Sequence, residues 1–264
     1  MDLAAAGLRV EVGGSAQGAP GVARVTLANP ERRNAQTPAT WRAQAAVGAG
    51  IPADVRVVVV DAEGPSFCAG LDTRMFTPEG VPGEPSLRDL AALAPAAQDA
   101  AIAGFQDGFS WLADDRFVSV AAVQGHAVGA GFQLALSCDL VVLADDARLC
   151  MREPTLGLVP DLGGTGRLVE AVGYARALEL CLTGRWMTAQ EAVAAGLALT
   201  TVPGAELATT TDELANALCA APVEAARATK RLLRSAVGTD AAAQRAAERA
   251  EQVRRIADLV RSAG

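Results

Sequence analysis

The sequence predicts an α/β fold that is followed by a helical segment. Through about residue 165, short apolar runs rich in Val alternate with stretches of helical pattern, which is typical of α/β domains. Beyond that point the chain is rich in Ala and Arg with periodic Leu and Val, which indicates helices. A chain of 264 residues is long enough to bury a substantial core, as one large domain or two small ones.

The expected strands are short apolar runs. The first two flank a Gly-rich turn at residues 13–21, which predicts a hairpin. The later ones are continuous apolar runs of the kind found in buried strands. The expected strands are Leu8–Val12, Val22–Leu27, Val55–Val60, Phe117–Val123, Leu140–Leu143 and Arg148–Met151.

Two expected helices begin at clear capping residues. Thr37 is a good N-cap with Pro38 at the first helical position, and this helix should run to about Ala49. Thr188 and Glu191 are spaced as a capping box, and that helix should close at Gly196. Residues 77–86 hold three Pro and two Gly, which predicts a mobile surface loop. The other expected helices run from about Leu87 or Gln98 to Ala113, over Phe132–Ser137, over Tyr174–Thr183, and as two or three helices after Asp212.

Charge and composition exclude several classes of protein. The formal net charge of −7 argues against a nucleic-acid binder that relies on a global basic field, although a local Arg cluster could still hold a phosphorylated ligand. His126 is the only histidine, so a His-rich metal site or a Ser-His-Asp triad would depend on one residue, and we expect no metal. His126 itself is expected to be a packed or surface turn residue.

Cysteine spacing and hydropathy indicate a cytoplasmic protein. The five cysteines are scattered and form no CxxC pair, which argues against a disulfide framework or a zinc site. No uncharged apolar stretch reaches 18 residues, so no membrane span is expected. The first residues lack the basic and apolar regions of a signal peptide.

Two glycine-containing turns are the strongest candidates for a functional site. They are Ser66–Asp72, which follows a strand, and Gly125–Gly131, which lies between a strand and a helix. Glycines at such turns let a ligand approach the backbone, and free N–H groups at a helix N-terminus favour developing negative charge. Two converging N–H groups would form an oxyanion hole. The alternative is that both are only tight strand-to-helix turns, and neither matches a Walker P-loop or a full GxGxxG.

Taken in order, a set of segments across nearly the whole chain resembles the crotonase family, the enoyl-CoA hydratase and isomerase superfamily. The resemblance implies a spiral of strand–strand–helix turns, which we place at residues 1–195. It also implies a helical oligomerisation segment, which we place at residues 196–264, and a homotrimer that is often paired into a hexamer. The segments are Pro30–Ala35, Val55–Asp61, Phe67–Asp72, Gly125–Leu134, Cys138–Asp139, Gly157–Thr165, Leu182–Arg185 and Thr188–Gly196.

The resemblance also implies a ligand and the residues that contact it. The ligand is an acyl-CoA thioester, whose oxygen would be held by the N–H groups of Leu71 and Ala130. No metal or redox cofactor is implied, because coenzyme A is part of the substrate. Asp72 could instead be a simple turn or cap residue. The positions that match the CoA and substrate groove are Arg33, Ala35, Ala69, Asp72, Gly129 and Gln133.

Three side-chain positions bear on the reaction. Hydratases of the family use two Glu residues, which correspond here to Gln133 and Glu153. An amide cannot act as a general base, so hydration by two carboxylates is compromised. Asp161 follows a proline as a carboxylate does in family isomerases. We therefore expect Asp161 and Glu153 to be catalytic in shifting a double bond through an oxyanion-stabilised enolate, and we favour Asp161 slightly because it matches the isomerase position.

Alternatives remain at each of these positions. Hydration of a 2-enoyl-CoA could use Glu153 alone with Gln133 orienting the water, and a non-catalytic acyl-CoA binder could keep the same fold. Asp161 could instead cap the turn at Gly163–Leu168. Glu153 could instead be a surface carboxylate paired with Arg152 or Arg148. The arginines between residues 227 and 254 indicate a solvated helix face, a subunit interface or a contact to the CoA phosphates.

Overall fold

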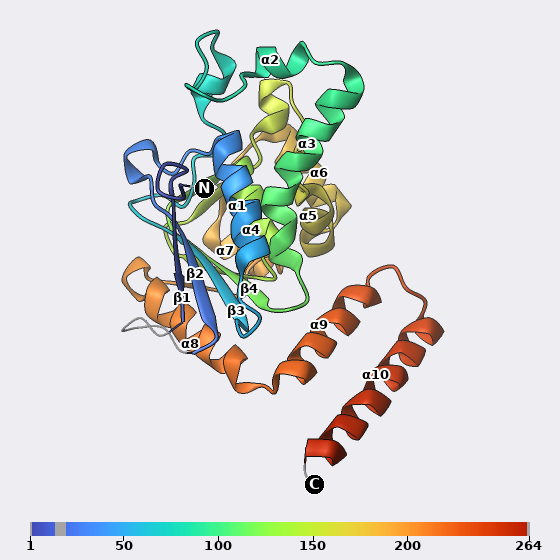
Figure 1. Cartoon of the computed structure of the whole chain (residues 1–264). Coiled ribbons are helices and arrows are strands. Elements are labelled where there is room, and N and C mark those ends of the chain that lie inside the picture. The colour runs from blue at the N-terminus through green and yellow to red at the C-terminus, as the bar shows by residue number, and fades with distance from the viewer. Residues whose placement is uncertain (1, 14–19, 263–264) are drawn as a thin grey trace.

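The computed structural model describes residues 2–13 and 20–262 and contains two β-sheets (Figure 1). The larger sheet has six strands in the order β1-β2-β3-β4-β6-β9. Its first two strands are antiparallel and all the others pair in parallel. Residues 14–19 of the turn in the predicted hairpin lie outside the described residues, but the pairing of its two strands is confirmed. The strands are β1 (Leu8–Val12), β2 (Val22–Leu27), β3 (Val57–Ala62), β4 (Val118–Val123), β6 (Leu140–Ala144) and β9 (Thr200–Val202).

The smaller sheet is built from short strands, and the chain enters two of them, β5 and β7, directly after leaving the larger sheet. Its order is β5 (His126–Val128), β7 (Arg148–Cys150) and β8 (Met187–Thr188). The chain passes from β4 to β5 and then into a helix, and it passes from β6 to β7 in the same way. This repeated order agrees with the spiral of strand–strand–helix turns that the family resemblance implies.

Helices cover both faces of the larger sheet. On one face, side chains of α1 and α3 pack into the main apolar core. On the other face, Leu207 and Ala215 of α8 pack against the valines of β3, β4 and β6. The helices are α1 (Pro38–Gly50), α2 (Leu87–Ala91), α3 (Pro95–Ser110), α4 (Ala130–Ser137), α5 (Gly164–Val172), α6 (Tyr174–Thr183), α7 (Ala189–Ala194), α8 (Leu207–Ala220), α9 (Val223–Ala236) and α10 (Ala241–Ser262).

Two local expectations about helices are wrong. Of the two expected starts of the helix that reaches Ala113, Leu87 is wrong, because Pro95 starts α3 and the residue before a proline is held in an extended conformation. The start near Gln98 agrees with α3 and the 3₁₀ turn Trp111–Ala113 that follows it. The capping box at α7 is only half formed. Thr188 accepts a hydrogen bond from the backbone N–H of Glu191 (3.1 Å), but the Glu191 carboxylate pairs with Arg185. The guanidinium offers a charged partner that outcompetes the reciprocal bond to the backbone.

The predicted helical tail is confirmed as three helices, which differ in their relation to the core. Helix α8 lies on the sheet, whereas α9 and α10 extend from it as a pair (Figure 1). Strand β9 also joins the larger sheet, so that sheet continues past residue 195. None of the helices among the described residues is long and apolar enough to cross a bilayer.

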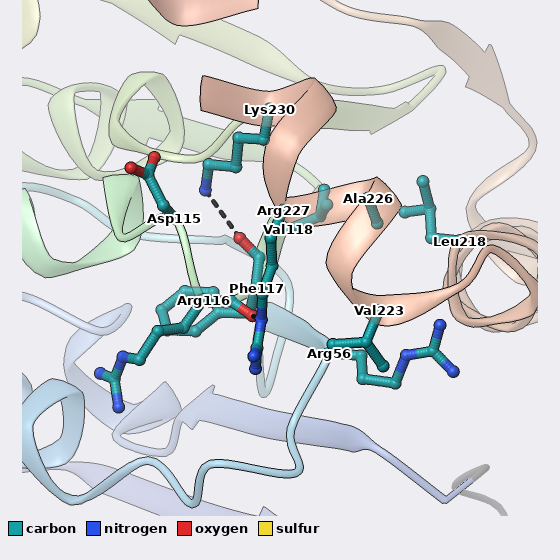
Figure 2. A pocket seen from close by; sticks show the side chains of 10 residues that line it. All are labelled: Arg56, Asp115, Arg116, Phe117, Val118, Leu218, Val223, Ala226, Arg227 and Lys230. Carbon is teal, nitrogen blue, oxygen red and sulfur yellow. Dashed lines mark hydrogen bonds between the residues drawn. The ribbon is translucent and has the colours of Figure 1, made fainter. Parts of the chain in front are cut away.

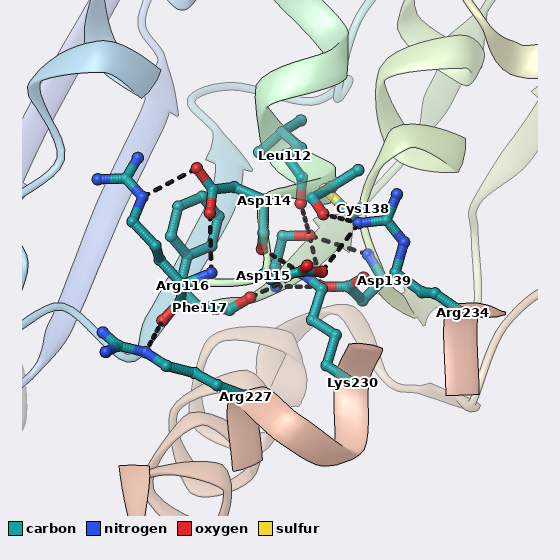
Figure 3. A network of polar contacts seen from close by, with 12 residues as sticks. Leu112, Asp114, Asp115, Arg116, Phe117, Cys138, Asp139, Arg227, Lys230 and Arg234 are labelled. Atoms are coloured by element: carbon teal, nitrogen blue, oxygen red, sulfur yellow. Dashed lines mark hydrogen bonds and ion pairs between the residues drawn. The ribbon is translucent and has the colours of Figure 1, made fainter. Parts of the chain in front are cut away.

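A buried lysine fixes α9 to the core. The Nζ of Lys230 donates to the carbonyl oxygen of Phe117 (2.7 Å), as Figure 2 shows, and to that of Asp114 (2.6 Å). It also pairs with Asp139 (2.7 Å; Figure 3). The Asp139 carboxylate accepts from the backbone N–H of Ser119 (2.8 Å) as well. All three ammonium protons therefore have acceptors, which a buried charge requires. The cavity beside Lys230 measures about 20 Å³, enough for water but not for a ligand.

Candidate active site

The two glycine-containing turns lie against each other. The backbone N–H of Cys68 donates to the carbonyl oxygen of His126 (2.9 Å), and Val128 donates back to Cys68 (3.0 Å). Gly70 has φ +89°, and a Cβ atom there would lie 2.6 Å from the carbonyl oxygen of Val128. A Cβ on Gly125 would lie 2.0 Å from the carbonyl oxygen of Pro65. These glycines therefore let one turn approach the other, which brings both to one site.

Two backbone N–H groups at this junction are free to bind a ligand. Leu71 and Ala130 line the same cavity, and neither N–H donates to an acceptor among residues 2–13 and 20–262. Ala130 is the first residue of α4, where the helix dipole adds to the attraction for negative charge. Two unpaired donors on one cavity can stabilise an oxyanion.

The cavity that they line measures about 220 Å³ and is mostly apolar. Its polar side chains are Thr73, Arg152 and Glu153, and Glu153 is the one carboxylate on it among the described residues. The backbone of Gly129 also lines it. The apolar lining residues are Trp41, Ala69, Gly70, Leu71, Phe76, Val128, Ala130, Leu156, Leu158 and Leu162.

The two oxygens of Glu153 have different surroundings. Oε1 accepts a hydrogen bond from Nε2 of Gln133 (2.7 Å). Oε2 is buried and has no hydrogen-bond partner in the described part of the chain. Burial raises the pKa of Glu153 and the nearby Asp161 adds to the rise, while hydrogen bonds from the backbone and from Gln133 oppose it. The alternative of a surface carboxylate is wrong, because Arg152 and Arg148 bind backbone carbonyl groups.

Asp161 lies beside this cavity and does not line it. Its backbone carbonyl oxygen accepts from Nε2 of Gln106 (2.6 Å), and burial raises the pKa of its carboxyl. The alternative of an N-cap is also wrong, because α5 begins after Gly163 and has no side-chain cap. Of the two carboxylates that the sequence singles out, the structure thus brings only Glu153 to the unpaired N–H groups.

Gln133 is fully buried and both ends of its amide contact protein groups. Its Oε1 accepts from the backbone N–H of Leu162 (2.9 Å) and of Gly164 (3.3 Å), and its Nε2 donates to Glu153. It is absent from the cavity lining, so it has no free polar atom to offer a substrate. Sequence reasoning missed this role, because backbone partners leave no signature in residue types.

Asp72 has the capping role that the sequence left open. It is buried, and its carboxylate accepts a hydrogen bond from the backbone N–H of Arg74 (3.0 Å) at the start of the 3₁₀ turn Thr73–Phe76. The same carboxylate forms ion pairs with Arg32 (3.0 Å) and Arg74 (2.9 Å). Burial would raise the pKa of Asp72, but these hydrogen bonds and charges outweigh it and lower that pKa. Sequence reasoning missed the two half-exposed arginines as partners of Asp72.

The other residues expected in the CoA groove are placed in different ways. Ala69 and Gly129 line the cavity. Ala35 and Arg33 do not line the cavity. The side chain of Arg33 is exposed and donates no hydrogen bond among the described residues. Arg33 has φ +50° and accepts from the N–H of Ala69 (2.9 Å), so its backbone supports the first turn. No cluster of three metal-ligating side chains occurs in the described ranges.

Curated relatives share this sequence pattern. A Mycobacterium bovis protein named as a probable enoyl-CoA hydratase is 34% identical over 177 residues, which cover 67% of this chain and 63% of that protein. The carnitinyl-CoA dehydratase of Proteus mirabilis is 35% identical over 182 residues, which cover 69% of this chain and 64% of that enzyme. The match spans less than two thirds of the length of both relatives.

Solved structures agree over almost the whole chain. A Thermobifida fusca YX protein that carries an enoyl-CoA hydratase assignment, crystallised in complex with CoA, is 49% identical with a TM-score of 0.91, covering 98% of this chain and 96% of that one. A Thermobifida fusca YX protein with the same assignment, in complex with acetoacetyl-CoA, is 50% identical with a TM-score of 0.91, covering 97% of each chain. Residues 17–261 match the family model described as enoyl-CoA hydratase/isomerase. The chain therefore belongs to the enoyl-CoA hydratase/isomerase family, in the crotonase superfamily.

Proposed function

We propose that this protein is an acyl-CoA enzyme that shifts a double bond in an enoyl-CoA thioester. One observation carries the proposal: Glu153, whose Oε2 is buried and without a partner among the described residues, lines the same cavity as the unpaired N–H groups of Leu71 and Ala130. A proton acceptor beside two oxyanion donors is what the formation of an enolate from a thioester needs. The Thermobifida fusca complexes with CoA and acetoacetyl-CoA support the choice of ligand.

The proposed reaction uses one carboxylate twice. The thioester oxygen accepts hydrogen bonds from the N–H groups of Leu71 and Ala130. The Glu153 carboxylate removes a proton from the α or γ carbon, and the electron pair moves into a dienolate whose charge these donors stabilise. The Glu153 acid then returns the proton to the other carbon, so no proton is gained or lost overall. Burial raises the pKa of Glu153, which favours the return step.

Hydration of a 2-enoyl-CoA is the second candidate, because relatives are named enoyl-CoA hydratase and carnitinyl-CoA dehydratase. Water addition requires one group to take a proton from water and a proton source for the α carbon. The amide of Gln133 cannot supply either, and both its ends are already bonded to protein. We therefore place isomerisation first. Neither reaction requires a metal or redox cofactor.

The oligomer stays a prediction that we also propose here. Side chains of Val253, Ile256 and Val260 on α10 are each more than half exposed in the single chain. Apolar surface of this kind favours association, and we expect a trimer or hexamer. Analytical ultracentrifugation at micromolar concentration would measure it, and a stable monomer would contradict it.

Side-by-side assays of 2-enoyl-CoA and 3-enoyl-CoA test the proposed reaction. Glu153→Gln should lower kcat for isomerisation by about 10²–10⁴-fold and leave the affinity for CoA nearly unchanged. Asp161→Asn should cost less, because Asp161 does not line the cavity. Glu248→Gln, on the exposed surface of α10, is the matched control.

Each other outcome assigns a different function. Efficient hydration by the wild type without isomerisation would make the protein a hydratase. A larger loss with Asp161→Asn than with Glu153→Gln would move the proton transfer to Asp161. No effect of either change on any acyl-CoA reaction would leave a non-catalytic acyl-CoA binder.

A further inference from the structure

Gln133 connects three parts of the site although it does not line the cavity. It lies on α4 three residues after Ala130, so both residues lie on one side of this helix. Its amide reaches the Glu153 carboxylate in one direction and the turn at residues 162–164 in the other. A single buried side chain thus links the helix that carries an oxyanion donor to the group that moves the proton.

The orientation of the Gln133 amide is fixed by its neighbours. Its Oε1 faces two donors, the backbone N–H groups of Leu162 (2.9 Å) and Gly164 (3.3 Å). A flipped amide would place its NH₂ group against both of them and its oxygen against the Glu153 carboxylate. Nε2 must therefore point at Oε1 of Glu153, 2.7 Å away.

This contact makes the two oxygens of Glu153 unequal. Oε1 is committed to accepting a hydrogen bond, so a proton on the carboxyl group belongs on Oε2. Oε2 is also the buried oxygen without a partner in the described residues. We infer that Gln133 is a positioning residue, which orients Glu153 so that Oε2 alone exchanges protons with the substrate. The inference rests on the proposed function and deepens it.

Two variants test the positioning role, one that removes the amide and one that displaces it. Gln133→Leu deletes the donor. Gly164→Ala adds a Cβ atom whose three nearest neighbours are all atoms of Gln133, the closest at 2.7 Å, so the amide has to move. Gly166→Ala is the matched control. Gly166 lies on the same helix α5, and a Cβ atom there would meet nothing within 4 Å.

Both test variants should lower kcat for the isomerisation of 3-enoyl-CoA, by about 10²-fold for Gln133→Leu, with KM nearly unchanged. The acid limb of the pH profile of kcat should move to higher pH, because the lost hydrogen bond stabilises the charged carboxylate. The charged and titratable groups near Glu153 stay unchanged in all variants. They are Asp161, Arg152, Cys150 and Cys181.

A second measurement keeps this inference separate from the proposed function. Carbon-13 NMR titration of the Glu153 carboxyl group, assigned by its loss in Glu153→Gln, reports the same pKa change without any turnover. A higher pKa in Gln133→Leu and Gly164→Ala than in the wild type and Gly166→Ala supports positioning. If Glu153→Gln abolishes turnover but neither test variant moves that pKa or kcat, the inference fails and the proposed function stands. If Glu153→Gln leaves turnover intact, the proposed function fails.

Discussion

Replacing Gln133 by Glu should convert the single carboxylate into a coupled pair. The new side chain can keep its acceptor bonds to Leu162 and Gly164, but its second oxygen would face Oε1 of Glu153 at the present distance of 2.7 Å. Two unit charges at that distance repel by about 6 kcal/mol with an effective dielectric constant of about 20. That energy corresponds to more than about four pKa units, so the pair should hold one proton at neutral pH.

The retained proton has consequences for stability and for activity. The folded pair has a raised pKa, so the variant loses stability relative to the wild type as pH rises from about 4 towards that pKa. A proton shared by two carboxylates also gives the site an acid beside a base. We expect Gln133→Glu to gain hydration of 2-enoyl-CoA without any gain in isomerisation.

Thermal denaturation across pH and the absorbance assay of 2-enoyl-CoA measure these two effects. Gln44→Leu, which removes another buried amide that does not line the cavity, controls for a general change in the core. A Gln133→Glu variant with the same pH dependence of Tm as the wild type would refute the coupling argument. Improved isomerisation without hydration would refute the assignment of Glu153 as the lone proton carrier.

Three further predictions concern the frame of the site. Gly70→Ala should lower the free energy of unfolding by about 1–3 kcal/mol, because its positive φ and the carbonyl oxygen of Val128 leave no place for a Cβ atom. The barrier for turnover should rise by more than that, and denaturant unfolding and kcat measure the two losses. Lys230→Met should destabilise the fold by about 3–5 kcal/mol by removing a buried cation and leaving the partly buried Asp139 without its partner, and a Tm equal to that of the wild type would contradict this. Asp72 has a lowered pKa in the folded state, so the stability it provides is present above its ordinary pKa and is lost as pH falls through the folded value. The Tm difference between wild type and Asp72→Asn should therefore shrink in acid, and a constant difference would show that Asp72 acts only as a neutral cap.

Much of the fold could be predicted because its signals are local. The hairpin strands and the helix that follows Thr37 and Pro38 begin where the residue pattern says they should. Strands β5, β8 and β9 were missed, because their two or three residues show little periodicity. The partner of Glu191 was not predictable either, since Arg185 competes with the cap only in the folded chain.

The candidate site also has parts that the sequence predicts and parts that it does not. The order of the motifs predicts the two turns and the positions of Leu71 and Ala130, and the structure brings them together on one cavity. The roles of Asp161 and Gln133 depend on the direction of side chains within a turn, which tertiary packing decides. The residue pattern therefore favoured the carboxylate after a proline slightly over Glu153, whereas of the two only Glu153 lines the cavity.

The cavity is assembled from three separate passes of the spiral, and this affects how the protein folds. Leu71, Ala130 and Glu153 are far apart in the chain, so the site has a high contact order and cannot form until each pass has closed on the one before. An acyl-CoA bound there would be held by all three passes at once. Its binding energy would slow hydrogen exchange across the larger sheet as well as in the loops that touch it.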